Sequence, residues 1–278
     1  MALLLHAHMH VSIARTATSA FDRSKRKTRH RSSGVENLVV AGPTPSSTRV
    51  LVTGGTGGTG KALVEKLAAQ GTPVAVLTRN ATKAKAALPA VELVEGDLFS
   101  YDTAVEAVAG RDIIFICSGT TSRLDPFDPF KIDWQGVENL VAAAKQQGGV
   151  KKIIMVSSIG VDDPFFPLNL PFVGNGVLWM KKLGELAVQR SGIDYSIIRP
   201  GGLRSTDDGK QRNVVAGGQN TFGLPPRPKL PGSIRRTTVA DACIAAMELP
   251  EVSRNKIVEL VEEEQAPAVT WAQVFSSV

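Results

Sequence analysis

From residue 49 onward, short apolar runs alternate with longer segments that have the spacing of amphipathic helices. The short runs predict buried strands at 49–53, 73–78, 91–96, 112–118, 151–158, 194–199 and 256–262. Helices are predicted at 58–70, 81–88, 100–109, 131–147, 176–191 and 268–278. Strands rich in Val and Ile that alternate with helices are typical of βαβ units. The pattern therefore predicts an α/β fold, a single Rossmann-like doubly wound parallel sheet with helices on both faces.

A glycine-rich stretch, "VLVTGGTGGTGKALVEKL" at 50–67, joins the first predicted strand to the first predicted helix. From Gly55 to Lys61 it has the start of a P-loop, which binds nucleoside triphosphates. A P-loop needs Ser or Thr after its Lys, because that hydroxyl binds the magnesium ion. Ala62 stands there instead, so we interpret the stretch as a dinucleotide-binding turn.

Each glycine of that turn has a physical role in the dinucleotide interpretation. Gly54 or Gly55 permits the tight turn, and Gly57 lets the backbone approach the pyrophosphate. Gly60 allows the helix to pack closely on the strand. The helix N-terminus near Gly58 then presents free N–H groups to the phosphates.

The residue about 20 positions beyond these glycines distinguishes NAD from NADP. An acid there would bind the ribose 2′-hydroxyl of NAD, but "AVLTRN" places Arg79 at that position. A guanidinium pairs with a 2′-phosphate through two hydrogen bonds. A charged hydrogen bond contributes about 1.5–3 kcal/mol, so we expect the protein to prefer NADP(H) over NAD(H) about 10–100-fold. The alternative is a solvated Arg at a strand end.

Composition narrows the classes of function further. The 278 residues are 43% hydrophobic and 21% charged, as in soluble globular proteins, and no apolar run approaches the length of a membrane span. All four histidines lie in the first 30 residues, which excludes His-based catalytic triads and imidazole metal sites from the body. Two cysteines are too few for a zinc site. We expect no metal and no nucleic-acid partner, because the body is close to neutral and has no aromatic-basic stripe.

The N-terminal segment, 1–47, has a different composition from the rest. It is rich in Ser, Thr, Ala and Arg and poor in acids, which is typical of an organelle transit peptide followed by a linker. Alternatives are a disordered basic tail, or a nuclear signal or phosphate-binding arm at 25–31. We expect the NAD(P)-binding domain, with C-terminal elements on the substrate side, at 48–278.

The motifs "TGGTGGTG", "LTRN", "EGDL", "VSSIG" and "SGIDYSIIRPGGL" resemble the atypical, NmrA-like branch of the short-chain dehydrogenase/reductase family. The likeness is greatest to plastid members, including the NADP-binding domain of a redox-sensing subunit of the chloroplast envelope translocon. It implies a plastid protein, in the stroma, that binds NADP(H). It also implies a plastid protein partner or a small-molecule acceptor, with at most peripheral membrane contact.

The resemblance also implies roles for individual residues. The pyrophosphate would be held by Thr56, Gly57, Gly58, Thr59 and Gly60. The 2′-phosphate would meet Arg79, and the adenine would lie beside Asp97 and Leu98. The adenosine and ribose would be lined by Ser118, Gly119 and Thr120, and the nicotinamide by Ser157 and Ser158. Its ribose would bind Lys181. Alternatives are a helix N-cap for Asp97 and a solvated helix position for Lys181.

One family feature is absent. Catalytic members carry a Tyr four residues before that Lys, which provides the proton for carbonyl reduction, but Val177 stands there. The two tyrosines, Tyr101 and Tyr195, fall in a predicted helix start and a predicted strand. A general acid contributes about 10²–10⁴-fold to rate, so its absence argues against an ordinary carbonyl reductase.

Two classes of function stay open. The first is an NADP(H)-binding protein that senses redox state or serves as a scaffold. The second is an NADPH-dependent reductase of a flavin, quinone or similar acceptor, with Ser157 and Lys181 as candidate catalytic residues. The apolar loop at 162–180 would be a lid, a membrane-surface patch or a packed loop. The Gly- and Pro-containing segment 205–230 predicts a mobile flap.

Overall fold

The computed structural model describes residues 47–120, 125–170, 173–206 and 208–278. The predicted transit peptide and linker therefore lie outside the described residues, except for Ser47. Within the described part of the chain, no helix combines the length and apolar character that a membrane crossing requires.

Seven parallel strands form the main sheet, in the order β3-β2-β1-β4-β5-β6-β10. They are β1 (Val50–Thr53), β2 (Val74–Thr78), β3 (Glu92–Glu95), β4 (Ile113–Ile116), β5 (Lys152–Val156), β6 (Asp194–Pro200) and β10 (Lys256–Glu263). Each corresponds to a predicted strand, so the Rossmann-like fold is confirmed. The strand order reverses between β1 and β4, which is where such folds bind their ligands.

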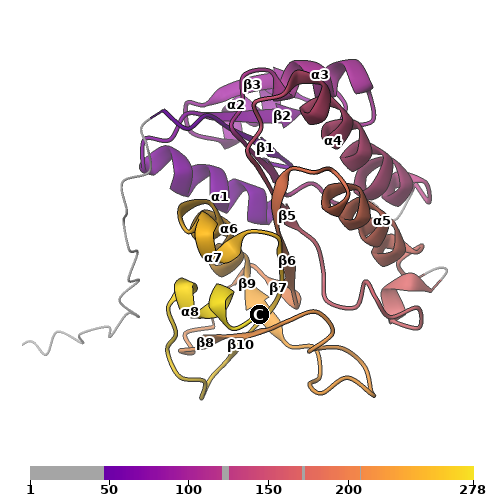
Figure 1. The fold of residues 1–278 in the computed structure, drawn as a ribbon, viewed down its shortest axis with the longest axis vertical. Coiled ribbons are helices and arrows are strands. Elements are labelled where there is room, and N and C mark those ends of the chain that lie inside the picture. The colour runs from indigo at the N-terminus through magenta and orange to yellow at the C-terminus, as the bar shows by residue number, and fades with distance from the viewer. Residues whose placement is uncertain (1–46, 121–124, 171–172, 207) are drawn as a thin grey trace, which may run out of the picture. The chain divides into compact units, whose positions relative to one another are not determined.

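Side chains that alternate along each strand pack on opposite faces of this sheet, and helices cover both faces (Figure 1). Val50 and Val52 pack with α1 (Gly58–Ala69) and α6 (Arg236–Glu248). The intervening Leu51 packs on the other face, which is covered by α3 (Tyr101–Val108), α4 (Gly136–Gln147) and α5 (Val177–Gln189). Burial on both faces explains the continuous apolar runs in the sequence.

Three further strands were not predicted. They are β7 (Gly202–Arg204), β8 (Asn213–Gly217) and β9 (Ser233–Arg235). Strands β8 and β9 pair antiparallel with β10, and β7 runs parallel to β9. The prediction that the whole of 205–230 is a mobile flap is therefore wrong for 213–217, because pairing with β10 satisfies the backbone of a strand that is only half-buried.

One long helix was not predicted from the sequence, and the remaining helical elements are short. The missed helix is α6, and the short ones are α2 (Ala81–Ala87), the π-helical turn η1 (Phe130–Gln135), the 3₁₀ turn η2 (Pro167–Asn169), α7 (Pro250–Ser253) and α8 (Trp271–Ser276). As predicted, the stretch before Gly176 forms no α-helix in the residues described, and α5 begins at Val177. Phe165 in this stretch is 80% exposed.

Candidate functional site

The glycine loop turns sharply from β1 into α1 at the carboxyl edge of the sheet. Gly54 has a φ of +69°, a conformation that favours glycine. The N–H of Gly57 donates to the carbonyl of Gly54 at 3.0 Å and closes the turn. A Cβ on Gly54 would lie 2.6 Å from the backbone nitrogen of Ser118. Of the two glycines predicted to allow the turn, Gly54 is therefore the one whose backbone requires it.

The other glycines of the loop differ in how much space surrounds them. A Cβ on Gly60 would lie 2.2 Å from the carbonyl oxygen of Gly54, so α1 packs directly on the loop. On Gly55 it would lie 2.7 Å from a methyl group of Val76 in β2. On Gly57 it would meet nothing closer than 3.3 Å. The loop thus has a packing side, with Gly55 and Gly60, and an open side.

The open side is suited to an anion. Thr56, Gly57 and Gly58 are exposed, and α1 begins at Gly58 without a side-chain cap and without an acid in its first turn. The first N–H groups of a helix have no partner within the helix, and the helix dipole adds partial positive charge there. The Oγ1 atom of the adjacent Thr59 is buried, with no hydrogen-bond partner in the described residues. These features fit the pyrophosphate of a dinucleotide.

Arg79 lies directly after β2, one strand along from the glycine loop. Its side chain is exposed, and within the described residues no ion pair engages it. The next residue, Asn80, caps α2 by accepting a hydrogen bond from the N–H of Lys83 at 2.8 Å. Arg79 is therefore held at a defined backbone position with a free guanidinium.

Asp97 and Leu98 follow β3. The Oδ1 atom of Asp97 accepts from the N–H of Phe99 at 3.0 Å, and Ser100 caps α3. The alternative of Asp97 as a helix N-cap is therefore wrong. Leu98 is buried against Gly136 at the start of α4 and is therefore part of the core. Asp97, in contrast, is exposed to solvent.

Lys181 on α5 forms a shielded ion pair with Asp133 on η1. The Nζ–Oδ1 distance is 2.8 Å, and the two side chains are 14% and 1% exposed. The other carboxylate oxygen accepts from the N–H and the hydroxyl of Thr120, at 3.1 and 2.6 Å. A Cβ on Gly119 would lie 3.1 Å from that Nζ. The alternative of Lys181 as a solvated helix residue is wrong, and the structure brings Gly119, Thr120 and Lys181 together.

Asp133 was missed by the sequence analysis. It precedes Val137, Leu140 and Ala144, which are buried at helical spacing, so it continues an apolar stripe. An acid in such a stripe needs a buried partner, so the position of Asp133 in an apolar stripe could have identified it from the sequence. Gly184 permits the contact between the two elements, because a Cβ there would lie 2.4 Å from the carbonyl oxygen of Asp133.

The serines at the ends of β4 and β5 have different environments. The hydroxyls of Ser118 and Thr53 share a hydrogen bond of 3.0 Å. Ser158 donates to the carbonyl of Ile159 at 3.0 Å. Ser157 is 4% exposed, and its hydroxyl has no partner in the described residues. Of these serines, Ser157 therefore keeps an uncommitted hydroxyl at the carboxyl edge.

The position of the family tyrosine is occupied by Val177 in the first turn of α5. Tyr195 is the second residue of β6, at the opposite edge of the sheet. Tyr101 begins α3 after the edge strand β3, and its hydroxyl is hydrogen-bonded to Gln146. Neither phenol replaces the missing acid.

A buried ionic network supports the carboxyl edge around β6. The guanidinium of Arg199, which is fully buried, donates two hydrogen bonds to Glu185 at 2.9 and 2.6 Å and one to Asp162 at 2.7 Å. Burial raises the pKa of Asp162, but hydrogen bonds from Lys182, together with the charge of Arg199, lower it to about 2. Glu259 of β10 joins the network at 3.3 Å. These contacts hold the loop after β5 against α5 and β10.

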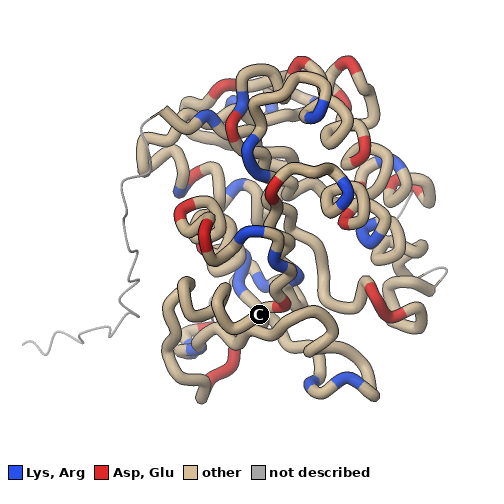
Figure 2. Tube along the Cα trace, viewed as in Figure 1, with Lys and Arg blue, Asp and Glu red and all other residues tan. Residues whose placement is uncertain are grey.

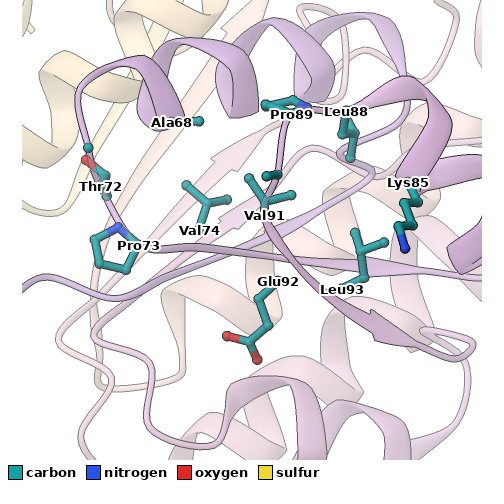
Figure 3. Close-up of a pocket in the computed structure, with 12 residues that line it drawn as sticks. Ala68, Thr72, Pro73, Val74, Lys85, Leu88, Pro89, Val91, Glu92 and Leu93 are labelled. Carbon is teal, nitrogen blue, oxygen red and sulfur yellow. The ribbon is translucent and has the colours of Figure 1, made fainter.

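A hollow of about 900 Å³ lies at the other end of the sheet (Figure 3). It is lined mainly by apolar side chains, among them Val74, Leu88, Pro89 and Val91. Its walls include the first residues of β2 and β3, so it opens at the amino edge. Ligands of open α/β sheets bind at the carboxyl edge, and the hollow is therefore separate from the glycine loop.

Comparison with known proteins relates this geometry to a family. The model of an NAD(P)H-binding family matches residues 54–250. The chloroplastic protein At2g34460 of Arabidopsis thaliana is 34% identical over 83% of this chain and 82% of its own length. The chloroplastic protein TIC 62 of the same plant is 31% identical over 78% of this chain, but over only 36% of its own length. The structure of ChuY, an anaerobilin reductase from Escherichia coli O157:H7, is 25% identical with a TM-score of 0.56, covering 80% of this chain and 100% of that one.

Proposed function

Since the chain belongs to the NAD(P)H-binding family whose model spans the glycine loop, we propose that it is a plastid NADP(H)-binding protein that senses redox state or serves as a scaffold. The resemblance to atypical short-chain dehydrogenases/reductases is confirmed by the family match and the relatives. The cofactor prediction is confirmed for NAD(P)H. The observation that carries the sensor or scaffold role is Val177 in place of a proton donor.

The proposed binding mode follows the order of strands along the carboxyl edge. The pyrophosphate lies on the open side of the loop at Thr56–Gly58, where α1 begins without a side-chain cap. The free guanidinium of Arg79 pairs with the 2′-phosphate, and Asp97 lies beside the adenine. Ser118 and Gly119 line the ribose next to β4, and Lys181 donates to the hydroxyls of the nicotinamide ribose.

The Asp133–Lys181 pair supports a binding role for Lys181 rather than an acid–base role. In carbonyl reduction the ammonium acts with a neighbouring phenol, and the side chain at that position here is an isopropyl group. Asp133 holds the ammonium of Lys181 in place through the 2.8 Å contact between Nζ and Oδ1. Lys181 thus orients a ribose, and no described group at this position delivers a proton to a carbonyl.

A plastid location is supported by the two plant relatives, both of which are chloroplastic. We place the protein in the stroma, where a soluble NADP(H)-binding domain meets its cofactor. The match to TIC 62 covers only about a third of that protein. A plastid protein partner of this chain would therefore bind the domain that the two proteins share.

A second candidate is a reductase whose acceptor needs little help with protonation, such as a flavin or quinone. The buried, uncommitted hydroxyl of Ser157 favours this candidate, because it is a hydrogen-bond donor at the end of β5. The name of ChuY, an anaerobilin reductase, adds support from a similar fold. In such a reaction the nicotinamide supplies the hydride, and the protein orients the two reactants.

One set of titrations separates the two candidates. The full chain is titrated with NADPH, NADP⁺ and NADH by fluorescence, and FMN or a soluble quinone is then added without oxygen. A sensor binds NADPH and NADP⁺ with different affinities, since only differential affinity shifts a conformational equilibrium, and NADPH is not oxidised when either acceptor is added. Rapid NADPH oxidation would establish the reductase, and no binding of any dinucleotide would refute both.

A further inference from the structure

Arg236, the first residue of α6, lies directly against the glycine loop. A Cβ built on Gly58 would be 2.5 Å from its Cδ atom and 2.6 Å from its Nε atom. The side chain of Arg236 therefore occupies the space that any side chain at position 58 would take. Gly58 has an ordinary backbone conformation, so this close approach, and not a turn, accounts for glycine at that position.

Within the described part of the chain, the guanidinium of Arg236 has only neutral partners. The guanidinium of Arg236 donates to the carbonyl of Leu203 at 3.2 Å and to the hydroxyl of Ser205 at 2.7 Å, both neutral groups. Among the described residues no carboxylate pairs with it. In contrast, the neighbouring Arg235 and the nearby Arg204 both bind Glu262.

The start of α1 adds further positive potential, because this helix begins here without an acidic residue in its first turn. Helix α6 also begins here, but the carboxylate of Glu262 accepts from the N–H of Arg235 and from the hydroxyl of Thr238 and so offsets the dipole of α6. Figure 2 shows Lys and Arg positions gathered where β7, β9 and the start of α6 lie. The guanidinium of Arg236, for which the described residues provide no carboxylate, the start of α1 and the missing side chain at Gly58 lie at one place.

We propose that Arg236 is a second contact for the pyrophosphate of the bound dinucleotide, supplied by α6 from across the glycine loop. The N–H groups of α1 bind the pyrophosphate on one side, and the guanidinium neutralises its charge from the other. Leu203 and Ser205 orient the guanidinium. This inference rests on dinucleotide binding at the loop, and it adds a residue 176 positions beyond Gly60 to that site.

The test compares Arg236→Ala, Arg236→Lys and the matched control Arg254→Ala, which removes the same charge from an exposed pair with Asp194. The Kd of the full chain is measured for NADPH, NADH and 2′-AMP. A charged hydrogen bond corresponds to roughly 10–100-fold in Kd, so Arg236→Ala should weaken NADPH and NADH by that factor. The Arg236→Lys variant should lose less, and the control should bind like the wild type.

The ligand 2′-AMP distinguishes the pyrophosphate from the 2′-phosphate, because it has only the latter. Its affinity should be unchanged in Arg236→Ala. A loss for 2′-AMP equal to that for NADPH would assign Arg236 to the 2′-phosphate and overturn the inference. Unchanged NADPH affinity in Arg236→Ala, with wild-type protein binding normally, would also overturn it while leaving the proposed function intact.

A second variant tests the explanation for Gly58. In Gly58→Ala the new methyl group must displace the Arg236 side chain, so NADPH binding should weaken as in Arg236→Ala. The double variant should lose no more affinity than either single variant, because both remove the same contact. Fully additive losses would refute the shared contact. Melting temperatures confirm that each variant is folded.

Discussion

Two glycines in the same loop should differ in how the same substitution affects the stability of the protein. Gly60 packs α1 on the carbonyl of Gly54, with 2.2 Å available for a Cβ, whereas Gly57 faces open space with its nearest contact at 3.3 Å. Gly60→Ala therefore tests helix packing, and Gly57→Ala tests the approach of a ligand to the backbone.

The expected magnitudes follow from these distances. In Gly60→Ala, backbone must move by about 1 Å, and overpacking of this kind costs about 1–3 kcal/mol. For a domain of this size that corresponds to a fall in melting temperature of about 2–10 °C. The displaced first turn of α1 should also weaken NADPH binding.

Gly57→Ala should leave the melting temperature nearly unchanged. Alanine is a poorer helix N-cap than glycine by up to about 1 kcal/mol, but replacing glycine lowers the entropy of the unfolded chain by a similar amount. Its φ of −83° is accessible to alanine. The methyl group lies where the pyrophosphate must approach, so the Kd for NADPH should rise about 10–100-fold.

The assay is thermal unfolding by circular dichroism together with fluorescence titration by NADPH on both variants. The reasoning predicts lost stability and affinity for Gly60→Ala, and lost affinity alone for Gly57→Ala. If Gly57→Ala bound NADPH like the wild type, the open side of the loop would not be the pyrophosphate site. If Gly60→Ala melted like the wild type, the close packing of α1 would be wrong.

Three other predictions concern single charged groups. Arg79→Ala should weaken NADPH about 10–100-fold and NADH much less, and equal losses in the two titrations would contradict its place at the 2′-phosphate. Lys181→Ala should weaken both cofactors and lower the melting temperature, because it leaves Asp133 buried without a cation; adding Asp133→Asn should restore the melting temperature but not the affinity. Lys152 is 5% exposed, and burial lowers its pKa from 10.5 to about 8. Between these two pH values the unfolded chain binds more protons than the folded protein. The free energy of unfolding therefore rises with pH across this range, by up to about 3 kcal/mol. Denaturant titrations from pH 7 to 10.5 should show that rise in the wild type and not in Lys152→Met.

The parts of the fold that could be predicted are those with a strong local signal. Strands β1, β4 and β5 are buried on both faces, so they appear in the sequence as continuous apolar runs. Helix α6 gave no such signal. Nine of its 13 residues are buried, and its own small apolar residues lie on all sides of the helix, so its sequence has no clear polar face. Strand β8 is half-buried along most of its length, and its pairing with β10 depends on a partner more than 40 residues away.

The candidate site also has features that follow from local sequence and features that depend on tertiary contacts. The glycine spacing, Arg79 after β2 and Val177 four residues before Lys181 are local patterns, so the sequence alone determined the type of fold, the class of cofactor and the absence of the usual acid. The Asp133–Lys181 pair and the contact of Arg236 with Gly58 join residues 48 and 178 positions apart. Only the tertiary structure decided these contacts, because which charges meet depends on how helices pack around the sheet and not on their spacing along the chain.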